Sequence, residues 1–150
     1  MRAEIVINTG LNGFVMLDRV IEVSISHIVG ARTFSDDPIF LCLESLAQLG
    51  AYHIRYLTDF SRHIFLIKID YVNLPPEKVI YGEYLLSGTL LHQSDSSFLC
   101  HLKAGKKNKI VMEGNLLFAA IDYDQNFRSD DLRHHYTRVF SCVRKDIKTG

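Results

Sequence analysis

The stretch FLCLESLAQLGAY, Phe40 to Tyr52, is apolar on nearly every side of the helix that it would form, yet it carries the carboxylate Glu44 and the amide Gln48. A helix of this composition is expected to be buried on most of its surface. An ionised carboxylate in an apolar setting is costly unless it is paired, hydrated or used in chemistry. Glu44 is therefore either a buried acid satisfied by a neighbour such as Arg55, or a functional group.

The helix is expected to run from about Pro38 to about Leu57. An Asp followed by a Pro, as at Asp37, is a strong start signal, because the Asp can cap the helix and Pro is tolerated in its first turn. One wide apolar stripe then recurs at helical spacing, namely Leu43, Leu46, Ala47, Gly50 and Ile54. A narrow polar strip holds Glu44, Gln48 and Arg55.

Strand patterns lie on both sides of this helix. Alternation and β-branched residues predict strands over residues 14–26, 27–34, 63–72, 78–92, 97–103 and 109–121. A hairpin turn is expected at Gly105 to Asn108, just before the last of them. The pattern predicts an α+β fold, an antiparallel β-sheet wrapped around a long central α-helix.

The composition excludes several classes of protein. The chain has 150 residues, of which 47% are apolar, which suits one domain with a hydrophobic core. Lys+Arg and Asp+Glu each total 17, so no net charge favours nucleic acid or an anionic membrane. No apolar run is long enough for a membrane span, and the first residues lack the apolar core of a signal peptide. The three cysteines have no metal-ligand spacing and suit reduced thiols, so we expect a cytoplasmic protein with no metal and no cofactor.

Residues 125–150 differ in character from residues 1–124, which we expect to form the main domain. Asp130 can cap a second, amphipathic helix that runs to about Val143. Its apolar face, with Leu132, Tyr136 and Phe140, is expected to dock on the domain or on a partner.

Three segments of the chain resemble the 3-hydroxyacyl-acyl-carrier-protein dehydratases of fatty-acid synthesis. Residues 13–22, GFVMLDRVIE, are similar to the opening "PF-x-x-(L/V)DRV-x-E" strand of that family. Asp37-Pro38-Ile39-Phe40 is similar to its "EPFF" segment, and Glu44-Ser45-Leu46-Ala47-Gln48 to its "E-(A/S)-LAQ" segment on the central helix. The resemblance covers about residues 14–121 and implies the hotdog fold.

The chain also departs from the family pattern. The family has a glycine-rich loop between "EPFF" and the helix, which supplies the catalytic histidine and the backbone donors for the thioester carbonyl. Here Phe40 is followed at once by Leu41-Cys42-Leu43-Glu44, so that loop and its histidine are missing.

The resemblance places Glu44 as the catalytic carboxylate that assists departure of the β-hydroxyl group. Gln48, one turn on, is a candidate for substrate binding or for a hydrogen bond that fixes the helix or a dimer. Phe40 and Leu41 are candidates for substrate binding, because amides in the first helical turn could replace the missing carbonyl donors. The implied substrate is an acyl thioester on acyl carrier protein or coenzyme A, and the implied assembly is a homodimer or higher homo-oligomer.

Three functions therefore stay open. The first is a dehydratase-like enzyme (a lyase) acting on a 3-hydroxyacyl thioester. The second is a hotdog thioesterase that uses Glu44 and a water molecule, for which loss of the histidine matters less. The third is a non-catalytic subunit that binds acyl groups or acyl carrier protein.

Overall fold

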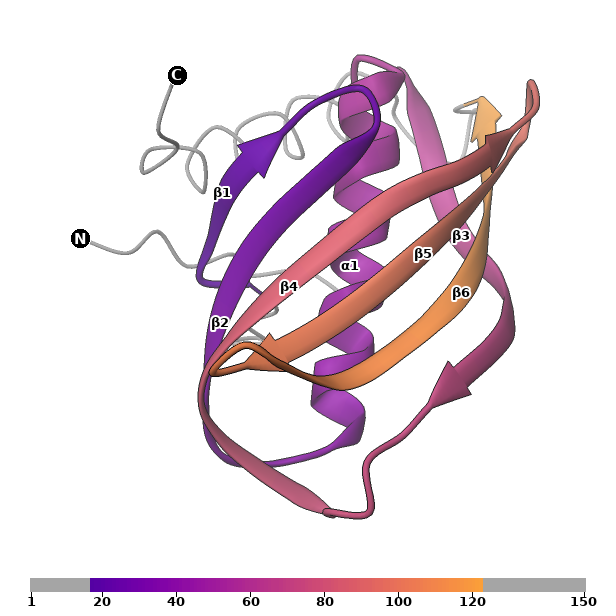
Figure 1. Ribbon diagram of the computed structural model, residues 1–150. Helices are drawn as coiled ribbons and strands as arrows, with labels where there is room; N and C mark the ends of the chain where they lie inside the picture. The colour runs from indigo at the N-terminus through magenta and orange to yellow at the C-terminus, as the bar shows by residue number, and fades with distance from the viewer. Residues whose placement is uncertain (1–16, 123–150) are drawn as a thin grey trace.

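The computed structural model describes residues 17–122, which form one six-stranded antiparallel sheet packed on one helix (Figure 1). The strands are β1 (Arg19–Val23), β2 (His27–Pro38), β3 (Arg62–Asn73), β4 (Val79–Gln93), β5 (Ser97–Lys106) and β6 (Lys109–Asp122), and the helix is α1 (Phe40–Leu57). The strand order across the sheet is β1-β2-β4-β5-β6-β3. The expected α+β arrangement, with an antiparallel sheet and one helix, is confirmed.

The sheet curves around α1, which lies along its concave face (Figure 1). Leu46, Leu49 and Ile54 of the helix are fully buried, and they join fully buried Ile28 and Leu86 from the central strands in one hydrophobic core. Alternate residues of β5 and β6 face this core, as strand geometry requires. The helix is thereby held in one orientation, with its N-terminus at the end of the sheet where β2 ends and β4 begins.

A single glycine sets the closest approach of helix and sheet. A Cβ atom added to Gly50 would lie 2.8 Å from Cζ of Phe118 on β6 and 3.1 Å from Cδ1 of Leu102 on β5. These distances are shorter than ordinary van der Waals contact. Gly50 therefore lets α1 settle against the middle of the sheet.

The helix begins two residues later than the sequence indicates. Its N-cap is Ile39, which makes no side-chain capping hydrogen bond, so the expectation that Asp37 caps the helix is wrong. Asp37 instead accepts a hydrogen bond from the backbone N–H of Ser35, at 2.9 Å. The physical reason is that β2 keeps pairing with β4 as far as Pro38, across an irregularity at Asp36, which has a φ of 53°.

Other boundaries are also refined. β1 ends at Val23, because the backbone N–H of Ser24 bonds to the carbonyl of His27 and closes a hairpin there. The β5–β6 hairpin turns at Lys107 and Asn108, both with positive φ, as a two-residue hairpin requires. The expected residues 14–16 of the first strand and the expected helix at 130–143 lie outside the described residues, as does the 125–150 extension.

Candidate functional site

Four residues predicted for the site share one face of α1. Phe40, Glu44 and Gln48 follow each other at intervals of four, so their side chains form one row, and Leu41 lies beside it. Phe40 is 55% exposed and Glu44 is exposed, whereas Leu41 and Gln48 are half-buried. The structure thus aligns these residues along the N-terminal half of the helix.

The exposure of Glu44 corrects the reading of that residue as a buried acid. The buried face of α1 is centred on Cys42, Leu46 and Leu49, about a quarter turn from the stripe that the sequence indicates. Arg55, the suggested partner, is buried with its guanidinium 5.3 Å from the ring of Tyr52. It lies eleven residues further along the helix than Glu44, a rise of roughly 16 Å.

A buried arginine lies beneath the site and was missed from the sequence. Arg32 on β2 is 8% exposed, and its Nη1 donates a hydrogen bond of 2.6 Å to Oγ of Ser45, which is fully buried. Ser45 is the neighbour of Glu44 in the chain. The signal was present in the alternation of β2, because residues 28, 30, 32 and 34 face the core, and Arg32 is the charged member of that row.

Nearby carboxylates partly offset the burial of the charge on Arg32. Burial lowers the pKa of its guanidinium, and the carboxylates of Asp37, Asp18 and Glu44 act in the opposite direction. The effect of Glu44 is the smallest of the three. The hydrogen bond to Ser45 holds the guanidinium of Arg32 against α1, at the residue that follows Glu44.

Asp18, from the segment similar to the family's "DRV" motif, makes hydrogen bonds that hold the backbone in place. Its carboxylate accepts a hydrogen bond of 2.7 Å from the backbone N–H of Thr33, and its own N–H donates to the carbonyl of Ala31 at 3.0 Å. Asp18 thereby ties the chain entering β1 to β2, close to Arg32.

The first turn of α1 is anchored to the sheet. The N–H of Ile39 donates to the carbonyl of Lys78 at 2.9 Å, and the N–H of Cys42 donates to the carbonyl of Ile39 at 3.0 Å. The amides of Phe40 and Leu41 lie between these two and belong to the turn that has no intrahelical acceptor. They lie one turn before Glu44 in the helix.

The thiol of Cys42 is not suited to nucleophilic chemistry. It is fully buried, and burial raises its pKa to about 12, against which the positive charge of Arg32 has a smaller effect. A thiol with this pKa is almost entirely protonated at neutral pH.

Two histidines, His53 on α1 and His63 at the start of β3, make their contacts away from Glu44. Nε2 of His53 donates a hydrogen bond of 2.8 Å to the backbone carbonyl of Ser24, and burial lowers its pKa. His63 packs edge-on against Phe65, and its pKa is lowered by burial and by the charge of Arg55. His63 thus lies at the helix end opposite to Glu44.

The other described histidines are on the sheet. His27 binds the carboxylate of Glu22 at 2.7 Å, and His101 bonds to Asn115 at 2.7 Å. His92 is exposed near the end of β4, far from the strand's start beside the helix N-terminus. Within residues 17–122, then, no histidine takes the place of the family's catalytic one.

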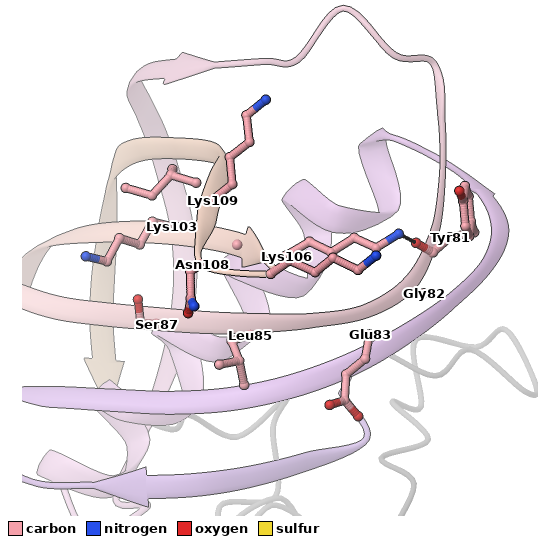
Figure 2. Close-up of a pocket in the computed structure, with 12 residues that line it drawn as sticks. Tyr81, Gly82, Glu83, Leu85, Ser87, Lys103, Lys106, Asn108 and Lys109 are labelled. Atoms are coloured by element: carbon pink, nitrogen blue, oxygen red, sulfur yellow. Dashed lines mark hydrogen bonds between the residues drawn. The ribbon is translucent and has the colours of Figure 1, made fainter.

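Two cavities adjoin each other around the β5–β6 hairpin, and neither is lined by Glu44. The larger has a volume of about 760 Å³ and is drawn in Figure 2. The smaller has a volume of about 390 Å³ and lies between the β3–β4 connection and the start of β6. Both are lined by Tyr81, Lys106, Lys109 and Ile110.

The described residues contain no group of three or more His, Cys, Asp or Glu side chains arranged to hold a metal ion. No helix in residues 17–122 combines the length and apolar character needed to cross a membrane.

Comparison with known proteins gives a fold and no family. No protein-family model matches the chain, and no curated protein matches it. Among solved structures, the dehydratase heterocomplex ApeI:P from Xenorhabdus doucetiae superposes with a TM-score of 0.61 at 16% identity, over 75% of this chain and 86% of that one. A thioesterase from Haemophilus influenzae gives 0.59 at 11% identity, over 69% and 77%. A mutant thioesterase from Pseudomonas aeruginosa gives 0.60 at 9% identity, over 70% and 81%. At these identities the similarity establishes the hotdog fold alone.

Proposed function

We propose that the protein hydrolyses an acyl thioester, with Glu44 as the general base. The observation that carries this proposal is the exposed carboxylate of Glu44 near the N-terminus of α1, on a helix that the Arg32–Ser45 hydrogen bond fixes to the sheet. The similarity in fold to thioesterases supports it. An exposed carboxylate has water within reach, and hydrolysis needs one carboxylate and one water molecule.

The proposed reaction uses groups on one helix turn. The carboxylate of Glu44 accepts a proton from water as the water oxygen attacks the thioester carbonyl carbon. The amides of Phe40 and Leu41 stabilise the negative charge that develops on the carbonyl oxygen. The C–S bond then breaks, the leaving thiolate takes the proton that Glu44 had accepted, and the carboxylic acid and free thiol leave with the Glu44 carboxylate regenerated. Gln48, half-buried one turn further along, would contact the acyl group.

A dehydratase-like role is the second candidate, favoured by the two segments DRV and ESLAQ on elements that the structure describes. In that role Glu44 assists departure of a β-hydroxyl group, and a second acid–base group must move the α-proton. No described histidine is placed to do so. The chain would then be a non-catalytic subunit that binds acyl groups, or it would catalyse dehydration together with a partner that supplies the histidine. The dehydratase among the similar structures is itself a heterocomplex.

A homodimer through β3 belongs to this proposal. Within the described sheet β3 is an edge strand, paired on one side with β6. Five large apolar side chains of β3 are between 38% and 57% exposed, namely Phe65, Leu66, Ile67, Ile69 and Tyr71. An exposed apolar edge of twelve residues favours pairing with the same strand of a second copy. Light scattering after gel filtration measures the assembly.

Glu44→Gln tests the function, because the amide keeps the volume and removes the charge and the proton-accepting oxygen. Hydrolysis of acyl thioesters of several chain lengths is expected in the wild type and should fall about 100-fold or more in the variant. Glu22→Gln on β1, also an exposed acid, is the matched control and should keep full activity. Hydrolysis unchanged in Glu44→Gln removes Glu44 from the mechanism. Hydration of an enoyl thioester without hydrolysis would instead support the dehydratase-like role.

A further inference from the structure

The larger cavity is a groove rich in lysine on the face of the sheet that points away from α1. Tyr84 and Leu86 of β4 are buried toward the helix, so Glu83, Leu85 and Ser87 between and beside them face outward into the groove. Lys103, Lys106, Lys107 and Lys109 also line the groove, against the single carboxylate of Glu83 (Figure 2). The lining thus has a formal excess of three positive charges, in a chain whose total charge is zero.

Lys106 is held in place at the junction of the two cavities. Its Nζ donates a hydrogen bond of 2.7 Å to the backbone carbonyl of Tyr81 and lies 4.0 Å from the centre of the Tyr81 ring, as Figure 2 shows. A Cβ atom on Gly82, whose φ is 92°, would lie 2.9 Å from that Nζ. The glycine leaves the space that the lysine occupies. An ordered cation over an aromatic ring loses less conformational entropy on binding an anion than a mobile surface lysine does.

The adjoining smaller cavity has a different lining. Pro75, Pro76, Val79, Ile80 and Val111 line it together with two lysines and two tyrosines, and Glu77 is its one acidic residue. Its wall includes Val79, which pairs with Pro38 of β2 just before α1 begins. The smaller cavity therefore adjoins Lys106 and lies beside the strand end that leads into α1.

We propose that the two cavities form one binding site for the phosphate-bearing arm of a thioester carrier. The phosphate groups lie among the four lysines, and the extended pantetheine chain passes Lys106 into the smaller cavity, along the prolines and branched apolar side chains of its wall. Lysine ammonium groups bind phosphate oxygens by charge-assisted hydrogen bonds. This inference rests on the proposed function and adds to it the place where the carrier is held.

Two sources share this chemistry, coenzyme A and the phosphorylated arm of an acyl carrier protein. A groove of about 760 Å³ is within the range that holds a drug-sized ligand, which is far more than one phosphate fills. The exposed ring of Tyr81, at 65%, offers a surface on which a base can stack. These features favour the nucleotide-bearing carrier, coenzyme A.

Calorimetric titration of the full chain with coenzyme A, 3′,5′-ADP, pantetheine 4′-phosphate and pantetheine tests the site without any need for turnover. Coenzyme A is expected to bind saturably, and pantetheine at least 10-fold more weakly. Each phosphate ligand is expected to bind more weakly at higher salt. Strong binding of pantetheine 4′-phosphate and none of 3′,5′-ADP would assign the arm to a carrier protein and support the same site. No saturable binding of either phosphate ligand, or equal binding of pantetheine and coenzyme A, overturns the proposal.

Variants locate the site. Lys106→Gln and Lys109→Gln are each expected to weaken coenzyme A binding about 10-fold, and Lys106→Arg to keep it. Glu83→Gln, which removes the only carboxylate of the groove, should tighten binding severalfold. Lys68→Gln on β3, whose lysine is 65% exposed and outside the groove, is the matched control and should change nothing. Coenzyme A binding unaltered in both Lys→Gln variants overturns the assignment.

The two proposals fail separately. A short acyl thioester without phosphate reports on Glu44 alone. If hydrolysis depends on Glu44 while coenzyme A binding does not depend on the lysines, the proposed lysine site is wrong and the proposed hydrolysis is supported. If coenzyme A binding depends on the lysines while no thioester is hydrolysed, the site stands and the hydrolysis is wrong.

Discussion

Replacing Ser45 by Ala should destabilise the protein through the buried guanidinium of Arg32. The substitution removes one hydroxyl from a position with no solvent access and takes away the acceptor of a 2.6 Å hydrogen bond. Hydrogen bonds to charged groups contribute about 1.5–3 kcal/mol, more than neutral ones, because the alternative is a charged donor cut off from water. Ala also has a higher helix propensity than Ser, which returns a few tenths of a kcal/mol. The free energy of unfolding is therefore expected to fall by about 1–2.5 kcal/mol.

Urea denaturation followed by circular dichroism measures this loss. Ser94→Ala is the matched control, since the Ser94 hydroxyl makes a side-chain hydrogen bond of similar length, 2.7 Å to Ser97, but on the exposed surface. The control should change the free energy of unfolding by less than about 0.5 kcal/mol. Equal effects of the two substitutions would refute the view that the Arg32–Ser45 contact is buried and strong.

Two further predictions concern packing and pH. Gly50→Ala should destabilise the protein by about 1–3 kcal/mol despite the better helix propensity of Ala, because the added methyl group would lie 2.8 Å from Phe118. Urea denaturation measures this loss of stability. An unchanged free energy of unfolding would mean that the helix and sheet are further apart than described. Burial lowers the pKa of His53 below its usual 6.5, so the folded protein binds this proton less readily than the unfolded chain, and the free energy of unfolding should fall as the pH drops below about 6.5. His53→Gln, whose amide can still donate to the Ser24 carbonyl, should flatten the acid side of a curve of unfolding free energy against pH, measured from pH 5 to 8. The control His92→Gln should leave the curve unchanged. Equal curves for the two variants would mean that another group causes the loss of stability.

The elements of the fold were predictable because their patterns are local. Alternation within β5 and β6 identifies their buried faces, and Asn108 in the turn between them is a residue type that accepts positive φ. The end of β2 was not predictable in this way. Asp36, Asp37 and Pro38 have the local composition of a helix start, but pairing of Asp37 with Ile80 and of Pro38 with Val79, more than forty residues away, extends the strand instead.

The position of the site residues on the helix was partly predictable. The sequence predicts a polar strip with Glu44, Gln48 and Arg55, but Arg55 is buried. Which part of the strip faces solvent depends on which apolar side chains the sheet accepts. Leu43 and Ala47 are half-buried, whereas Leu49 and Tyr52 are buried, so the core selects one side of a helix that is apolar nearly all round. Sequence periodicity cannot decide this rotation when both sides would be acceptable to a core.

The length of the connection before α1 explains why Glu44 is open. β2 ends at Pro38 and α1 begins at Phe40, so Ile39 is the only residue between them, and its N–H is already bonded to the carbonyl of Lys78. A connection of one residue has no chain with which to cover the first turns of the helix. Phe40 and Glu44 are consequently exposed in the described part of the chain. Dehydration releases water and is helped by a site that excludes it, whereas hydrolysis consumes water at the attacked carbon. An open carboxylate therefore suits hydrolysis better, unless a second chain covers it.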